Sequence, residues 1–362
     1  MDAGRLAPVL ALHRELPAAG DLVWSPYSVA SALGLAAAGA RGTTRDELAG
    51  VIAPGADLAA LATTLARAAE LEDAELAVAN SLWTREGRPF EEPYRQQVLS
   101  WPGGALHNAD FARDPEGARR AVNAEVAKTT RELVKELLAP GAVHADIVAL
   151  VVNALYLKAA WLHPFPEAAT RPASFHAPSG TRDVPTMHVQ QDHLPYAAAG
   201  GWRLVTLGTH GGVVADVVLP DGDLADAERG LGTDQLGRLY AAARPAKVQL
   251  ALPRFRLETS LPGLKPVLRR LGVTAAFDRG AADFTGMTPA REPVWIEEIA
   301  HKAVLRVDED GLEGAAATAV LMRTVAMVGG GPIRFDVDRP FLVVVRHAET
   351  GAVYFLARVT EP

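Results

Sequence analysis

Three consecutive acidic residues, Asp308, Glu309 and Asp310, form the longest run of carboxylates in the sequence. Neighbouring carboxylates of this kind could transfer protons or bind a hard cation. The run follows a strand-like segment, however, and charged side chains at a strand end are usually hydrated. We therefore interpret the cluster as the solvated end of a strand and not as a catalytic centre.

The other side chains that could do chemistry do not assemble into a familiar motif. The chain has no cysteine, which excludes disulfides, zinc–thiolate sites and a cysteine nucleophile. Its ten histidines are dispersed without ligand spacing, and the phosphate-binding loops, nucleophile elbow and zinc-protease motif are absent. We expect no metal and no cofactor. Ser-His-Asp triads are defined by geometry and not by chain order, so an enzyme remains an alternative.

Composition narrows the classes of partner. The 362 residues are 49% hydrophobic but only 6% aromatic, so the core must consist mainly of Ala, Val and Leu. A net charge of -7 argues against nucleic acid or an anionic membrane as the partner. The first 16 residues have helical amphipathicity and lack the apolar core of a signal peptide. As written, the chain is expected in the cytoplasm; it would be extracellular if an upstream signal had been removed.

Strand and helix patterns alternate irregularly along the chain. Residues 147–157 are almost wholly apolar, which is typical of a strand buried on both faces, and Asn153 lies inside this run. A second such strand is expected over 212–219, and 341–345 with 352–359 should form a terminal hairpin. This mixture predicts an α+β fold. Because no linker interrupts the chain, we expect a single domain over residues 1–362.

One segment, GLEGAAATAVLMRTVAMVGGGP at 311–332, carries only two charges. A connection of this length in a compact fold is either functional, disordered or a misassigned element. The simplest alternative is a buried, alanine-rich helix over about 313–323.

Several short motifs, in this order and spacing, resemble the serpin family of serine protease inhibitors, and in particular its inhibitory, prokaryotic-type members. They are Trp24-Ser25-Pro26-Tyr27-Ser28, Val152-Asn153-Ala154-Leu155-Tyr156-Leu157-Lys158 with Trp161, Leu252-Pro253-Arg254-Phe255, Ala282-Asp283-Phe284-Thr285-Gly286, His301-Lys302-Ala303-Val304 and Arg339-Pro340-Phe341-Leu342.

The resemblance implies a serpin fold with three β-sheets, about eight or nine helices and an exposed reactive-centre loop at about 310–332. It also implies a suicide-substrate inhibitor. A serine protease would cleave the loop and form a covalent acyl-enzyme, and the loop would insert as a strand into the central sheet of a metastable monomer.

The hinge of that loop is placed, by the same resemblance, at the start of the low-charge segment. Its residues are Glu309, Gly311, Leu312, Glu313, Gly314, Ala315, Ala316, Ala317 and Thr318. Small side chains suit a segment that must pass between existing strands without overfilling the core. Leu312 and Gly314 depart from the pattern of inhibitory members, which usually have Thr or Ser and Ala there. A non-inhibitory serpin with a binding or chaperone-like role is therefore the alternative function.

Family spacing places the scissile bond between Val325 and Ala326, which suits the shallow pocket of an elastase-like or other apolar-preferring protease. The alternative bond, Arg323-Thr324, implies a trypsin-like target. The resemblance also implies that a further set of residues lies beneath the central sheet and at the point where insertion starts. These residues are Ser25, Pro26, Ser28, Asn153, Trp161 and His301. A buried Asn needs hydrogen-bond partners, which a hydroxyl and an imidazole could supply.

Overall fold

The computed structural model describes residues 3–55, 57–261, 263–288, 293–312 and 331–362. Within these ranges the chain forms nine α-helices and fifteen strands, in the α+β arrangement expected from the sequence. Most of the expected hinge and both candidate scissile bonds fall in 313–330, which lies outside the described residues. No helix in the described ranges is long and apolar enough to cross a membrane.

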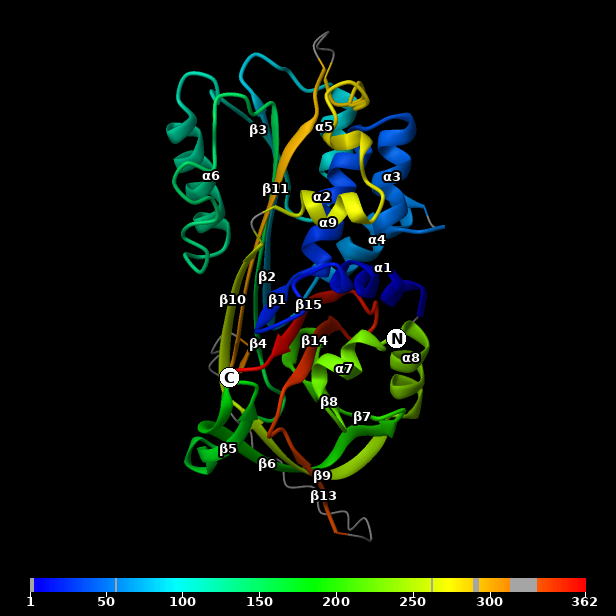
Figure 1. Ribbon diagram of the computed structural model, residues 1–362, viewed down its shortest axis with the longest axis vertical. Helices are drawn as coiled ribbons and strands as arrows, with labels where there is room; N and C mark the ends of the chain where they lie inside the picture. Colours follow the sequence, from blue (N-terminus) through cyan, green and yellow to red (C-terminus); the bar gives the residue numbers. More distant parts are fainter. Residues whose placement is uncertain (1–2, 56, 262, 289–292, 313–330) are drawn as a thin grey trace.

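A six-stranded sheet runs along the long axis of the molecule (Figure 1). Its strands, in spatial order, are β10 (Phe255–Leu261), β11 (Ile296–Val307), β12 (Gly311–Leu312), β4 (Ala149–Ala160), β2 (Ala74–Arg85) and β3 (Gly104–Ala109). β11 also pairs directly with β4, in parallel, from Ile296 and Ala149 to Ala303 and Leu155. The apolar run expected over 147–157 is therefore a central strand of this sheet.

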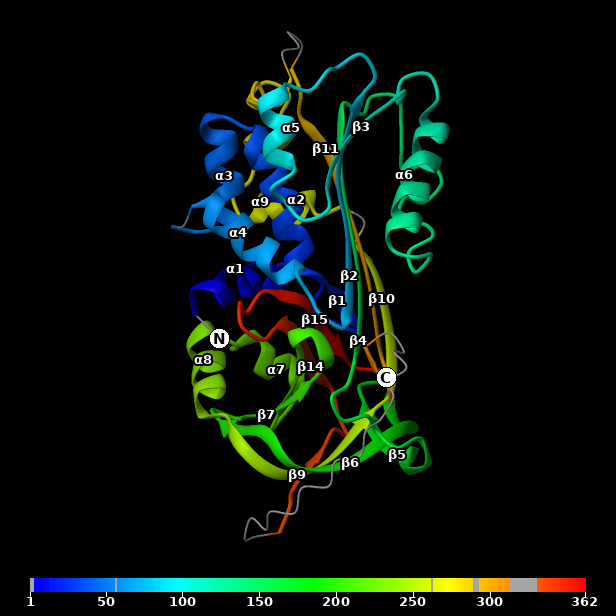
Figure 2. The ribbon, with the colours of Figure 1, turned by 180° about the vertical axis from the view of Figure 1, so that it is seen from behind.

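Both faces of the six-stranded sheet are covered (Figures 1 and 2). α6 (Pro115–Thr129) packs on one face over a core that includes Val122, Val126 and Val152. The other face meets a bundle of α2 (Pro26–Gly39), α3 (Gly42–Ile52), α4 (Leu58–Ala69), α5 (Glu92–Val98) and α9 (Lys265–Arg270). Burial on both faces explains why β4 shows no alternation of polar and apolar residues.

α2 passes through the centre of the molecule because nearly all of its residues are small or apolar. Ser25 caps its start, since its side chain accepts a hydrogen bond from the backbone N–H of Ser28, and Pro26 occupies the first helical position. The capping serine and the proline that follows it therefore determine where this buried helix begins.

The remaining strands form one nine-stranded network. Its elements are β1 (Leu22–Trp24), β15 (Val353–Val359), β14 (Phe341–His347), β8 (Val213–Pro220), β7 (Trp202–Gly208), β6 (Gly180–Ala199), β9 (Arg244–Pro253) and β13 (Ile333–Asp336), with β5 (Arg171–Ala177) beside β6. The 20-residue β6 pairs with β5, β9 and β7 in turn. Two of the three expected sheets are therefore continuous through this strand.

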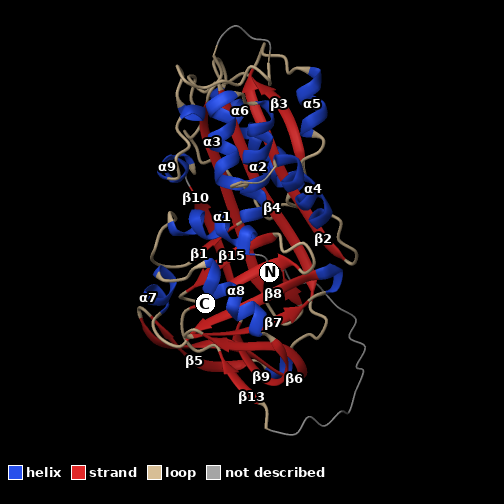
Figure 3. Cartoon of the chain, turned by 90° about the vertical axis from the view of Figure 1, so that its right-hand side faces the viewer, coloured by secondary structure: helices blue, strands red, loops and turns tan. Residues whose placement is uncertain are grey.

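Three helices flank this network (Figure 3). They are α1 (Ala3–Arg14), which is the helix expected at the start of the chain, α7 (Leu224–Arg229) and α8 (Thr233–Ala242). The terminal hairpin expected from the sequence is formed by β14 and β15.

Candidate functional site

The short strand β12 lies between β4 and β11 near the end of β4. Gly311 pairs with Ala160, and Leu312 pairs with Ala159 on one side and Val307 on the other. The Leu312 side chain is fully buried, at 0% exposure, in the core that also contains α2. Gly311 and Leu312, which were expected to belong to the hinge, therefore form a short strand between β4 and β11.

The first residue of β12 has to be glycine. A Cβ atom on Gly311 would lie 2.3 Å from the carbonyl oxygen of Ala159 and 2.9 Å from the Cα of Ala160. Both neighbours are backbone atoms of a central strand and cannot move aside cheaply. Any residue with a Cβ atom would therefore clash with β4 at this position, and glycine is what allows β12 to pair there.

Trp161 anchors the turn that leads into β12. Its indole Nε1 donates to the carbonyl of Asp308 at 2.9 Å, and its backbone N–H donates to the carbonyl of Asp310, also at 2.9 Å. The backbone N–H of Phe165 donates to the carbonyl of Glu309 in the same way, and the Phe165 ring packs edge-on against Trp161. Trp161 therefore lies directly after β4 and holds the turn that precedes β12.

Two residues of the acidic run, Asp308 and Glu309, are buried and the third, Asp310, is half-buried, so the interpretation of the run as a solvated strand end was wrong. Asp308 is 4% exposed and Glu309 7% exposed. The Asp308 carboxylate accepts hydrogen bonds from the backbone N–H groups of Asp310 and Gly311, which closes the turn. The Glu309 carboxylate accepts from the Thr170 hydroxyl at 2.8 Å and pairs with Arg254. Hydrogen bonds and an opposite charge compensate the loss of hydration, which sequence alone did not predict.

A polar layer crosses the six-stranded sheet at one level. Asn80 on β2 faces Asn153 on β4, and Asn153 faces His301 on β11. Residues directly opposite one another in a sheet share a face. All three are buried, at 0–1% exposure, on the face that meets α2.

These side chains form a directed chain of hydrogen bonds, which we call the latch and define as Asn80, Asn153 and His301. Asn80 Nδ2 donates to the Pro102 carbonyl at 2.8 Å, and Asn153 Nδ2 donates to Asn80 Oδ1. His301 Nδ1 lies 2.5 Å from Asn153 Oδ1, and His301 Nε2 accepts from the backbone N–H of Ser25 at 3.1 Å. The latch therefore joins three strands to the start of α2.

The direction of the chain fixes the protonation of His301. Because Nε2 accepts a hydrogen bond, the single proton of the neutral ring must be on Nδ1, where it is donated to Asn153. Complete burial favours the neutral form and lowers the pKa of His301 from 6.5 to about 3. A neutral imidazole bound to an amide and a backbone N–H is not the arrangement of a Ser-His-Asp triad.

The residues expected beneath the sheet do come together. Asn153 Nδ2 donates to the backbone carbonyl of Ser28 at 2.5 Å, and Ser25 meets His301 through its backbone. The two serines thus take part through the backbone and helix capping and not through the hydroxyl contacts we expected. Pro26 lies between them in the first turn of α2.

Asn80 is the member of the latch that sequence reasoning missed. It interrupts the apolar pattern of β2, where nearly all neighbouring residues are buried. That interruption is the same signal that identified Asn153. Glu309 has two partners, Thr170 and Arg254, and neither was identified as a partner from the sequence, because both are far from Glu309 along the chain.

The sequence profile described as Serpin (serine protease inhibitor) matches residues 9–362. The chain is a serpin. The resemblance that the motifs carried is confirmed, and with it the serpin fold.

Relatives of this serpin match over almost their whole length. Serpin-Z2A of Oryza sativa subsp. japonica is 31% identical, over 99% of this chain and 97% of that protein. Iris of Ixodes ricinus is 31% identical, over 95% and 93%. The crystal structure of Serpin48, described as a highly specific serpin of the insect Tenebrio molitor, is 26% identical with a TM-score of 0.87 over 99% of this chain and 96% of its own.

Proposed function

We propose that this serpin inhibits a serine protease as a suicide substrate, by inserting its cleaved loop between β4 and β11. The observation that carries the proposal is the position of β12. Gly311 is paired with β4, and Leu312 is paired with β4 on one side and with β11 on the other, so a strand has already begun between the two. The family consists generally of protease inhibitors and not of catalysts, so we do not expect enzymatic activity.

The register of β12 predicts how the hinge would insert. Each further residue of an antiparallel strand moves one residue back along both neighbours. Six residues beyond Leu312 is Thr318; six residues before Ala159 is Asn153, and six before Val307 is His301. In the inserted state Thr318 would therefore enter the latch, between the two side chains that now bond to each other.

A hydroxyl at that position suits the chemistry of the latch. Separation of the strands removes the bond between His301 and Asn153 and leaves a buried donor and a buried acceptor. A threonine hydroxyl can accept from His301 Nδ1 and donate to Asn153 Oδ1. Insertion would replace the lost hydrogen bond with two new ones.

The same register accounts for the two departures from the inhibitory pattern. Leu312, the larger residue, lies beside Ala159 and Val307, whereas Gly314 would lie between Leu157 and Leu305. Side-chain volume is therefore complementary across the three strands. Glu313 would lie between Lys158 and Arg306, where opposite charges stabilise neighbouring strands. Leu312 and Gly314 are thus compatible with insertion.

In the proposed reaction, the protease serine attacks the carbonyl carbon of Val325. The bond to the nitrogen of Ala326 breaks, that nitrogen leaves with a proton as an amine, and Val325 remains as an ester on the serine. A small β-branched residue favours an elastase-like or similarly apolar-preferring target. The competing bond, Arg323-Thr324, would require a trypsin-like target.

The test is incubation with elastase and, separately, with trypsin. We expect a complex with elastase that survives boiling in detergent, and a C-terminal fragment that begins at Ala326 by mass spectrometry. Cleavage at the competing bond would instead release a fragment that begins at Thr324, two residues longer. Cleaved serpin with fully active protease in both reactions would contradict inhibition.

Insertion itself is tested by Ala316→Arg. If the register of β12 continued, this residue would lie between Leu155 and Ala303, on the face of the buried core. A buried, unpaired charge there costs several kcal/mol, so the variant should be cleaved without forming a complex. Gly331→Arg is the matched control, because it lies beyond both candidate bonds at an exposed position and should leave complex formation intact.

The alternative function is a non-inhibitory serpin with a binding or chaperone-like role. It predicts that cleavage of the loop leaves the thermal midpoint unchanged, because no strand is added. Under the proposed function, the midpoint of the cleaved protein rises sharply because insertion adds hydrogen bonds and buried area.

A further inference from the structure

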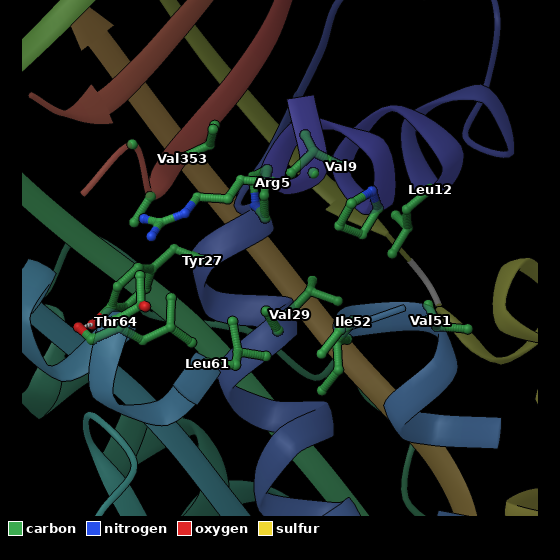
Figure 4. A pocket seen from close by; sticks show the side chains of 18 of the residues that line it. Arg5, Val9, Leu12, Tyr27, Val29, Val51, Ile52, Leu61, Thr64 and Val353 are labelled. Carbon is green, nitrogen blue, oxygen red and sulfur yellow. Dashed lines mark hydrogen bonds between the residues drawn. The ribbon is translucent and has the colours of Figure 1, made fainter. Parts of the chain in front are cut away.

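An apolar cavity of about 340 Å³ lies beside α2, and none of the latch residues lines it (Figure 4). It is lined by α1, by the first turn of α2, by the end of α3, by the first half of α4 and by the turn between β14 and β15, and it is partly open to solvent. Figure 4 shows Val9, Val29, Val51, Ile52 and Leu61 pointing into this space. No part of the proposed inhibitory mechanism uses it.

The size of the cavity is that of a small-molecule site. Ligand pockets start at roughly 300 Å³, and a cavity of about 150 Å³ is large enough to bind benzene. A space of about 340 Å³ therefore accommodates an apolar body of roughly twice that size. Its lining is mostly aliphatic, which favours an alkyl chain or a small ring system.

The two hydroxyl groups at the wall are already committed as donors. Tyr27 donates to the carbonyl of Leu65 at 2.8 Å, and Thr64 donates to the carbonyl of Ala60 at 2.9 Å. They do not offer a strong polar anchor to a ligand. The body of the pocket should therefore select for apolar groups.

Arg5 is the one charged side chain among the lining residues, all of which belong to the described ranges. In Figure 4 it extends from α1 across the pocket, and its guanidinium donates to the carbonyl of Thr350 in the β14–β15 turn. None of the ion pairs formed in the described part of the chain involves Arg5. A guanidinium has five N–H donors, so most remain available to a carboxylate at the rim.

We propose that this cavity binds a small amphipathic anion, with its alkyl or aryl body among the aliphatic side chains and its carboxylate on Arg5. The class of ligand follows from the combination of an apolar space and a single cation at its edge. The proposal does not depend on protease inhibition.

Calorimetric titration with sodium decanoate tests the site. We expect one decanoate to bind per chain and to raise the thermal midpoint, since a ligand of the folded state stabilises it. Decylammonium, which has the same chain and the opposite charge, should bind at least about tenfold more weakly, because a charged hydrogen bond is replaced by repulsion. Absence of decanoate binding, or equal binding of the two compounds, would overturn the proposal.

Two pairs of variants locate the binding. Arg5→Met should weaken decanoate binding about tenfold or more, whereas Arg45→Met, at an exposed arginine of α3 outside the pocket, should not. Ala30→Phe fills the cavity from α2 and should abolish binding. Ala60→Phe places a ring over the cavity from its exposed rim and should also weaken decanoate binding. Because Ala60 is exposed, this variant should fold even if Ala30→Phe does not. Unchanged affinity in Arg5→Met, or in both filling variants, would contradict the assigned site.

Discussion

His301 Nδ1 and Asn153 Oδ1 lie 2.5 Å apart across the junction of β11 and β4, the two strands between which we propose that the loop inserts. The bond is buried and its donor is a neutral imidazole. Opening the sheet at this level therefore requires that a buried hydrogen bond be broken and replaced.

Acidification should destabilise the native state through His301. Its pKa is lowered to about 3 in the folded protein, so unfolding takes up a proton below the ordinary value of 6.5. The stability contributed by the neutral ring is fully present above pH 6.5 and is lost as the pH falls from 6.5 toward 3. The slope is about 1.4 kcal/mol per pH unit for one proton. Urea unfolding between about pH 7.5 and 4.5 measures it.

The substitution His301→Gln should reduce that slope by about one proton, since glutamine does not titrate. His163→Gln, at an exposed histidine, is the matched control and should keep the wild-type slope. Equal slopes for wild type and His301→Gln would contradict the assignment of a neutral, buried ring.

Asn153→Ala should destabilise the native state more than Asn80→Ala. Removal of Asn153 deprives three buried groups of a partner: the Ser28 carbonyl, Asn80 Oδ1 and His301 Nδ1–H. Each such group costs about 1–3 kcal/mol. Asn80→Ala leaves Asn153 bonded to both Ser28 and His301, so its effect should be smaller. Urea midpoints of the two variants at neutral pH give the comparison, and a larger loss for Asn80→Ala would contradict the central place of Asn153.

Gly314→Leu should convert inhibition into simple cleavage. The inserted side chain would compete for space with Leu157 and Leu305, and overfilling a packed core costs about 1–3 kcal/mol. The ratio of detergent-stable complex to cleaved serpin should fall. Gly331→Leu makes the same change beyond both candidate bonds and should leave the ratio as in the wild type. An unchanged ratio for Gly314→Leu would refute the register deduced from β12.

Trp161→Phe should loosen the hinge without abolishing the fold. Phenylalanine keeps most of the ring packing against Phe165 but removes the Nε1 donor from the Asp308 carbonyl. Loss of one buried hydrogen bond costs about 1 kcal/mol. Hydrogen exchange in peptides that cover 306–312 should therefore become faster, while exchange in α6 stays unchanged. Equal protection in wild type and variant would show that the turn does not depend on this bond.

Long apolar runs allowed the framework of the fold to be predicted from sequence. The strand around Asn153 and the terminal hairpin are examples, because burial on one or both faces imposes a simple pattern. The position of Trp161 and the meeting of Asn153 with His301 were inferred from family resemblance alone. Their separation along the chain, 148 residues for the Asn153 and His301 pair, leaves no local signal.

The parts that sequence did not predict depend on tertiary compensation. Asp308 and Glu309 are charged, and nothing local to them shows that backbone N–H groups, Thr170 and Arg254 would compensate their burial. The cavity beside α2 was also unforeseen, because it arises from the angles at which four helices meet and not from any one of them.

If the loop inserts as proposed, the pairing of Leu312 with Ala159 would give the new strand a fixed origin, and the residues of β4 would mark how far the loop reaches. Counted from that origin, Met322 would reach Ala149, the first residue of β4. A protease attached to Val325 would be carried three residues past this end of the strand, and one attached to Arg323 only one residue past it. The two-residue difference is about 7 Å of extended chain. The choice of bond would thus decide how far beyond the sheet a trapped protease comes to rest.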